Sequence, residues 1–101
     1  MSNNYPCNLR EIALENTSEA VDRLVSILSE SMTFKESREV DYALGYINSE
    51  EGMEKIKYYL FNGTQIQRNY CALYFGRIHQ YKVLREAYDL GLIDEIQAFS
   101  R

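Results

Sequence analysis

Apolar residues recur along this chain at steps of three and four, the spacing that places side chains on one face of an α-helix. The clearest run in the N-terminal half begins at Ala20 and continues through Leu24 to Leu28. No segment alternates apolar and polar residues over the length of a strand. The pattern predicts an all-α protein of six to seven helices, covering residues 8–15, 18–28, 33–47, 49–62, 64–78, 81–90 and 92–100.

Residues that favour helix starts stand at the boundaries of these segments. Thr33 is followed by Glu36, and Thr64 by Gln67, so each threonine begins a capping box in which side chains and backbone N–H groups satisfy one another. Ser49 precedes two glutamates and has the chemistry of an N-cap. These signals predict that helices begin just after residues 33, 49 and 64.

The chain also contains an internal repeat. Gly45 and Gly76 lie 31 positions apart, as do the two capping-box threonines. We interpret both glycines as packing positions that relieve crowding, and Gly63 as a helix stop that tolerates the left-handed conformation. Helical hairpins of this length stack on their neighbours to bury a shared core. We therefore expect a single helical-repeat domain over residues 8–101, with units 8–30, 33–62 and 64–91, a closing helix over 92–100 and a flexible arm over 1–7. The closing helix is expected to cover the open end of the stack with an apolar face made of Leu92, Ile93, Ile96 and Phe99.

The second copy of this repeat resembles a known family. Its pattern has an arginine, two small residues three and four positions later, an apolar residue, a glycine and a further apolar residue, here Arg68, Cys71, Ala72, Phe75, Gly76 and Ile78. It is similar to the first helix of the short HEAT-like repeats of phycobilisome-lyase-type proteins. The earlier copy departs from the pattern, because Ser37 occupies the arginine position. The resemblance implies a short right-handed α-solenoid of stacked antiparallel hairpins, and it transfers no active site.

Charge is unevenly distributed over the 101 residues, although the net charge is only −4. Residues 1–54 contain four Lys/Arg against eleven Asp/Glu, whereas residues 55–101 contain seven against four. The asymmetry has three interpretations: random drift of a small surface, a basic half that faces an acidic partner, or two chains that pair head to tail as a homodimer. No apolar run approaches the roughly 20 residues of a membrane span, and the polar N-terminus does not resemble a signal peptide, so we expect a cytoplasmic protein.

The sequence offers no catalytic or metal-binding motif. It has no glycine-rich phosphate loop, nucleophile elbow or paired-histidine motif, and His79 is its single histidine. Cys7 and Cys71 are expected to be reduced thiols, with Cys71 packed in the core. We therefore predict no catalytic residue, no bound metal and no cofactor, and we rank an enzyme third among the possible functions.

Tyrosine is over-represented, with nine in the chain, and most of them lie within or beside the repeats. Tyr59 and Tyr70 are expected at the edge of the core. On the second helix of each hairpin, aromatic and charged residues point away from the apolar face, which is the composition of protein interfaces. The leading hypothesis is a non-enzymatic module (an adaptor, regulatory or immunity-type protein) that binds a protein partner through Lys57, Tyr58, Tyr81, Arg85 and Tyr88.

Nucleic-acid binding is the alternative, because the resemblance includes HEAT-like proteins that grip DNA along a basic face. The residues that would contact the phosphates are Lys55, Lys57, Arg68, Arg77, Lys82 and Arg85. The acidic isoelectric point of about 5.0 ranks this alternative second, since electrostatic binding to a polyanion normally needs a stronger basic excess.

Overall fold

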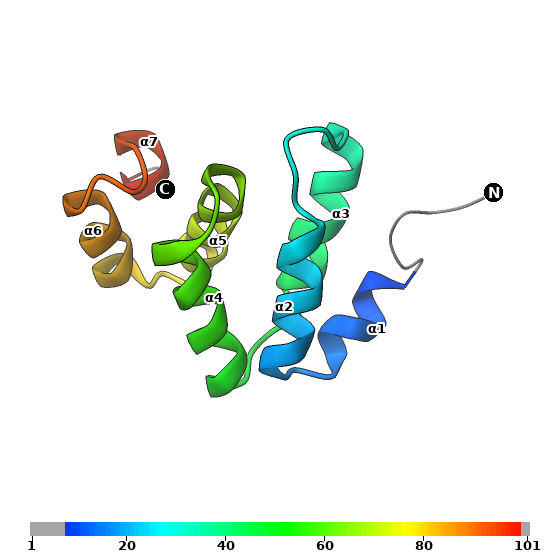
Figure 1. The fold of residues 1–101 in the computed structure, drawn as a ribbon. Helices are drawn as coiled ribbons and strands as arrows, with labels where there is room; N and C mark the ends of the chain where they lie inside the picture. The colour runs from blue at the N-terminus through cyan, green and yellow to red at the C-terminus, as the bar shows by residue number, and fades with distance from the viewer. Residues whose placement is uncertain (1–7, 100–101) are drawn as a thin grey trace. The chain divides into compact units, whose positions relative to one another are not determined.

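The computed structural model describes residues 8–99, and every regular element within this range is an α-helix (Figure 1). The all-α prediction is therefore confirmed. The predicted arm of residues 1–7, which includes Cys7, and the end of the closing helix at residue 100 lie outside the described residues. The helices of the described range are α1 (Leu9–Leu14), α2 (Ser18–Ile27), α3 (Phe34–Leu44), α4 (Glu50–Asn62), α5 (Gln65–Arg77), α6 (Tyr81–Asp89) and α7 (Glu95–Phe99).

The chain divides into two compact units, and the boundary between them falls inside α4, between Lys55 and Ile56. The first unit carries five Lys/Arg against eleven Asp/Glu, a net charge of −6, and the second carries six against four, a net charge of +2. The charge asymmetry seen in the sequence thus follows the division into units. The single domain over 8–101 and its repeat units stay predictions.

Both capping boxes form as the sequence predicted. The backbone N–H of Glu36 donates to Thr33 Oγ1 (3.1 Å), and that of Thr33 donates to Glu36 Oε1 (2.8 Å). In the same way, the Gln67 N–H donates to Thr64 Oγ1 (3.3 Å) and the Thr64 N–H to Gln67 Oε1 (2.9 Å). Each box satisfies two N–H groups that helix geometry leaves without a partner, which fixes the first turns of α3 and α5.

In the first unit, α1, α2 and α3 pack against one another. Ser37 is buried with the core, and its Oγ donates to the Phe34 carbonyl (2.9 Å), so the hydroxyl keeps a hydrogen bond inside the protein. The small serine side chain stands where the repeat pattern has an arginine. The buried apolar residues of this unit, which match the helical periodicity, are Leu9, Ile12, Ala13, Ala20, Val21, Leu24, Val25, Leu28, Val40, Ala43, Leu44 and Ile47.

Asn16 joins the turn after α1 to the turn before α4. Its φ is +60°, a left-handed conformation that asparagine tolerates better than most residues. Its Oδ1 accepts hydrogen bonds from the N–H groups of Asn48 (2.9 Å) and Ser49 (3.0 Å), and its carbonyl accepts from Ser49 Oγ (2.7 Å). Ser49 Oγ also accepts from the Gly52 N–H (3.0 Å), which confirms the predicted N-cap of α4. This set of bonds ties the two turns together.

In the second unit, α5, α6 and α7 pack against one another. Cys71 is fully buried, as the sequence predicted, and burial raises the pKa of its thiol to about 12 because a thiolate would lose its hydration there. Tyr74 is buried as well, whereas Tyr59 and Tyr70 are half-buried. The buried residues of this unit are Ile56, Leu60, Cys71, Ala72, Tyr74, Phe75, Val83, Leu84, Ala87, Ile93 and Ala98.

The expected apolar face of the closing helix is only partly right. α7 begins at Glu95, and its one buried residue is Ala98, with Ile93 buried in the preceding turn. Ile96 is 75% exposed and Phe99 38% exposed. The apolar residues of this segment therefore divide between the core and the surface.

The structure also corrects the roles assigned to the glycines. A Cβ placed on Gly76 would meet nothing within 4 Å, so this glycine relieves no crowding, although at Gly45 a Cβ would lie 3.1 Å from the Tyr42 carbonyl oxygen. Gly63 is not in the left-handed region, but a Cβ there would lie only 2.7 Å from the Tyr59 carbonyl oxygen. Gly63 is therefore needed for close approach and not for its φ. The two repeated glycines have different environments.

These environments predict opposite effects of two alanine substitutions. Gly76→Ala should raise the free energy of unfolding by about 0.5–1 kcal/mol, because alanine restricts the unfolded chain and favours the helix. Gly63→Ala should lower it by about 1–2 kcal/mol, because its Cβ must displace a backbone oxygen. Urea unfolding followed by circular dichroism measures both. Equal effects of the two substitutions would contradict this assignment.

Candidate functional site

α6 has one buried face and one exposed face. Val83, Leu84 and Ala87 are buried, so helical geometry turns Arg85 and Tyr88 outward. Arg85 is exposed and its Nε lies 3.2 Å from Oδ1 of Asp89, one turn further along the helix, while Tyr88 is half-buried. The apolar pattern of α6 thus presents one of the residue pairs that the sequence assigned to a partner-binding surface.

Phe99 of α7 joins this pair. Its ring centroid lies 5.0 Å from that of Tyr88, with the two rings nearly perpendicular, and 6.0 Å from Cζ of Arg85. Edge-to-face rings and a guanidinium near a ring face attract one another, so the three side chains hold a shared position at the surface. We call Arg85, Tyr88 and Phe99 the α6–α7 surface. The sequence placed Phe99 in the apolar cover of the stack, and its pairing with Tyr88 depends on a tertiary contact that spacing does not reveal.

The contacts given below for the other predicted partner-binding residues are with side chains outside the α6–α7 surface. Lys57 and Tyr58 are exposed on α4, where the Tyr58 ring meets Tyr59 edge-on at 5.3 Å. Tyr81 is half-buried at the start of α6, and its hydroxyl lies 2.6 Å from Nδ1 of His79. His79 is exposed with a φ of +62°, at the left-handed position that ends α5.

Several residues assigned to a nucleic-acid surface have contacts within the protein, Lys55 and Arg68 among them. Lys55 pairs with Asp22, with Nζ 3.5 Å from Oδ1. Arg68 is part-buried, and its guanidinium donates to the carbonyl oxygens of Leu92 (2.9 Å) and Gly63 (2.8 Å) and to Gln65 Oε1 (2.9 Å). These bonds tie the start of α5 to the turn before it and to the turn between α6 and α7. The remaining four, Lys57, Arg77, Lys82 and Arg85, are exposed.

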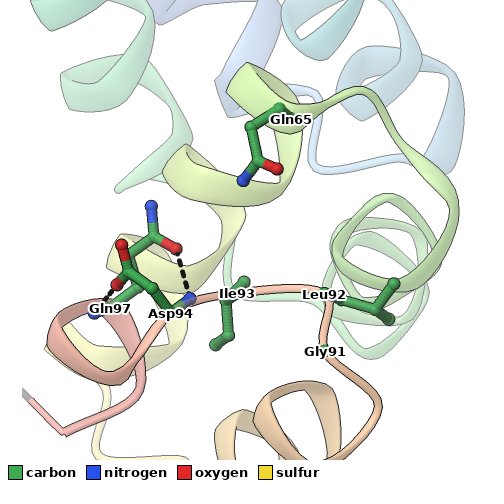
Figure 2. A pocket seen from close by; sticks show the side chains of 6 residues that line it. All are labelled: Gln65, Gly91, Leu92, Ile93, Asp94 and Gln97. Atoms are coloured by element: carbon green, nitrogen blue, oxygen red, sulfur yellow. Dashed lines mark hydrogen bonds between the residues drawn. The ribbon is translucent and has the colours of Figure 1, made fainter.

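An open pocket of about 250 Å³ is lined by residues from the start of α5, from the turn after α6 and from α7 (Figure 2). Asp94 and Gln97 bond to each other at its rim, since the Asp94 N–H donates to Gln97 Oε1 (2.9 Å) and the Gln97 N–H to Asp94 Oδ1 (2.8 Å). Gln65 and Gln97 both donate to Asn69 Oδ1. These polar groups are used to start α7 and to hold it on α5, so the pocket is part of the scaffold. Its lining residues are Gln65, Gly91, Leu92, Ile93, Asp94 and Gln97.

A second exposed cluster, on α3, was not assigned to a site by the sequence. Phe34 is 73% exposed and Tyr42 63% exposed, and Arg38 lies between them, with its Cζ 5.7 Å from the Phe34 ring and 5.5 Å from the Tyr42 ring. Arg38 Nη2 also donates to the Tyr42 hydroxyl (2.7 Å). Arg10 of α1 lies over the Tyr46 ring, 5.6 Å from its centroid. In the sequence, this cluster could have been recognised because aromatic and basic residues recur at every fourth position, at 34, 38, 42 and 46.

Comparisons with known proteins identify no relative: no family model, no curated protein and no solved structure matches the chain. The HEAT-like resemblance therefore stays a prediction. In residues 8–99, no three His, Cys, Asp or Glu side chains gather in a way that could hold a metal ion. Among the helices of that same range, none combines the length and the apolar character needed to cross a membrane.

Proposed function

We propose that this protein is a small non-enzymatic interaction module that binds a protein partner through the second helices of its hairpins, α4 and α6. The observation that supports it best is the α6–α7 surface, where the Phe99 ring lies near both Tyr88 and Arg85 and all three side chains remain accessible. Aromatic and arginine side chains carry most of the binding energy in protein interfaces, and rigid ones lose little entropy on binding. Lys57 and Tyr58 contribute the corresponding contacts from α4.

The alternative function, nucleic-acid binding, has less support. Three of the six cations that would contact a phosphate backbone already have contacts described above: Lys55 pairs with Asp22, Arg68 donates to backbone carbonyls, and Arg85 pairs with Asp89. The second unit has a net charge of only +2. Binding of this kind gains its free energy from the number of cations that meet phosphates. We therefore prefer a protein partner.

The test is capture of a partner from cells that contain the protein, with matched surface variants. Arg85→Glu and Tyr58→Ala should each reduce the captured partner by about tenfold, since such residues are typical hot spots, with the thermal unfolding midpoint unchanged. Lys82→Glu, on the same helix but outside the α6–α7 surface, is the control for a charge change and should retain capture. Undiminished capture by both Arg85→Glu and Tyr58→Ala would refute the proposal.

We further propose that the helices belong to a short right-handed HEAT-like solenoid, in a cytoplasmic protein that is able to form a homodimer. The two capping boxes, 31 residues apart, support the repeat, because they start α3 and α5 in the same way. A crystal structure tests the solenoid: successive hairpins that do not stack with a common hand would exclude it. Light scattering gives the oligomeric state, and fractionation of cells gives the location.

A further inference from the structure

The α3 cluster lies in the first unit and is independent of the α6–α7 surface. We define the α3 stripe as Phe34, Lys35, Arg38, Tyr42, Tyr46 and Arg10, the last of which reaches Tyr46 from α1. Its three rings are 73%, 63% and 43% exposed, which corresponds to roughly 350 Å² of accessible aromatic surface. A patch of this size on a monomer is often functional, and it amounts to almost half of one partner's share of a standard interface.

The α3 stripe is basic, whereas the unit to which it belongs is acidic. The unit contains five Lys/Arg, and three of them, Arg10, Lys35 and Arg38, are on the stripe. Among residues 8–99, none of these three has a carboxylate within ion-pairing distance, whereas Arg23 pairs with Glu15 and Lys55 with Asp22. The unit as a whole has a net charge of −6. Its cations are therefore concentrated on one face, among its most exposed aromatic rings.

Arg38 is also held in a conformation that suits a carboxylate. Its guanidinium lies between the Phe34 and Tyr42 rings, and one of its N–H groups donates to the Tyr42 hydroxyl. The guanidinium has five N–H donors in a planar fork that matches the two oxygens of a carboxylate. The neighbouring acids Glu39 and Asp41 already have partners inside the protein. A carboxylate that approaches the stripe thus meets a fixed donor flanked by apolar surface.

We propose that the α3 stripe binds an acidic segment of a partner protein, in which carboxylates alternate with apolar side chains. The carboxylates meet Arg38, Arg10 and Lys35, and the apolar side chains cover the three rings. Phe34 and Tyr42 are separated by about 12 Å along the helix, a length that one short peptide segment spans. A nucleic acid is disfavoured, because a polyanion that extends beyond the stripe would meet the net negative charge of the unit.

Selection from a displayed library of short random peptides on the full-length protein tests this inference. We expect the selected peptides to be enriched in Asp and Glu next to aromatic or aliphatic residues. Synthetic copies of them should lose about tenfold in affinity with Arg38→Glu and with Phe34→Ala, as is typical of hot-spot contacts. Arg23→Glu makes the same charge change elsewhere in the unit and should leave the affinity within about twofold, the behaviour of a residue outside the contact.

Three outcomes would overturn the inference. They are selected peptides without acidic enrichment, acidic peptides whose affinity is unchanged by Arg38→Glu and Phe34→Ala, and a labelled single-stranded oligonucleotide that binds through Arg38 where acidic peptides do not. Since Phe34 and Arg38 are exposed, circular dichroism of each variant should match the unchanged protein. Arg85→Glu should leave peptide binding at the stripe intact, which separates this result from the test of the α6–α7 surface.

Discussion

Asn16→Ala should lower the free energy of unfolding by about 2–4 kcal/mol, one of the two largest effects we expect from a single substitution. The change removes the acceptor for the Asn48 and Ser49 N–H groups, and it leaves alanine at a φ of +60°. For L-residues other than Gly, Asn and Asp, this conformation costs about 1–2 kcal/mol. Urea unfolding of the full chain measures the loss.

Two further variants separate the backbone and side-chain contributions at this position. Asn16→Gly removes the same hydrogen bonds but accepts the left-handed conformation, so its loss should be smaller than that of alanine. Asn16→Asp keeps the acceptor oxygen for the Asn48 and Ser49 N–H groups but loses the Nδ2 donor to Asn48 Oδ1. Because the exposed Asn48 amide can turn its NH2 group toward the new carboxylate, this variant should be the mildest of the three. A ranking in which alanine is as stable as aspartate would mean that the turn is held by other contacts.

Arg68→Met should destabilise the protein by about 2–4 kcal/mol, because it leaves the carbonyl oxygens of Leu92 and Gly63 without their charged donor. Methionine keeps much of the arginine stem, so the loss of packing is small. Arg68→Lys keeps the charge but not the fork, and it should recover less than half of the loss. Lys82→Met, at an exposed position of the same unit, should change the free energy of unfolding by less than about 0.5 kcal/mol.

If Arg68→Lys were as stable as the unchanged protein, charge alone would explain the contribution of this residue. That result would mean that the planar fork of hydrogen bonds to Leu92 and Gly63 is not needed to hold the two turns.

The helix starts of this protein could be predicted from sequence because their determinants are local. A threonine and the glutamate or glutamine three residues later act within one turn, and both boxes formed as expected at Thr33 and Thr64. The roles of the glycines were not local. Whether Gly76 faces open space, or a Cβ at Gly45 would lie close to the Tyr42 carbonyl oxygen, depends on how neighbouring backbone is placed. A repeated residue type therefore did not imply a repeated environment.

The candidate surfaces show the same limit. Arg85 and Tyr88 could be placed on one side of α6 from the positions of Val83, Leu84 and Ala87, which helical periodicity assigns to the core. The contribution of Phe99 required the tertiary contact between α6 and α7. Arg68 was assigned to a binding face by its charge, whereas the structure uses that charge to hold two turns. The sequence alone does not show whether a charged side chain binds another group of the same chain or a separate molecule.

The position of the unit boundary within α4 bears on how this protein could be dissected or have arisen. Hairpin duplication would place its junctions in turns, yet the division by compactness falls between Lys55 and Ile56 and leaves six residues of the helix on one side and seven on the other. Helices that short are marginal when isolated in water. A fragment that ends at Lys55 therefore contains only half of α4. A fragment that ends at the turn before or after α4 instead divides one of the two compact units. The compact units therefore do not share their boundary with the predicted repeat units 33–62 and 64–91.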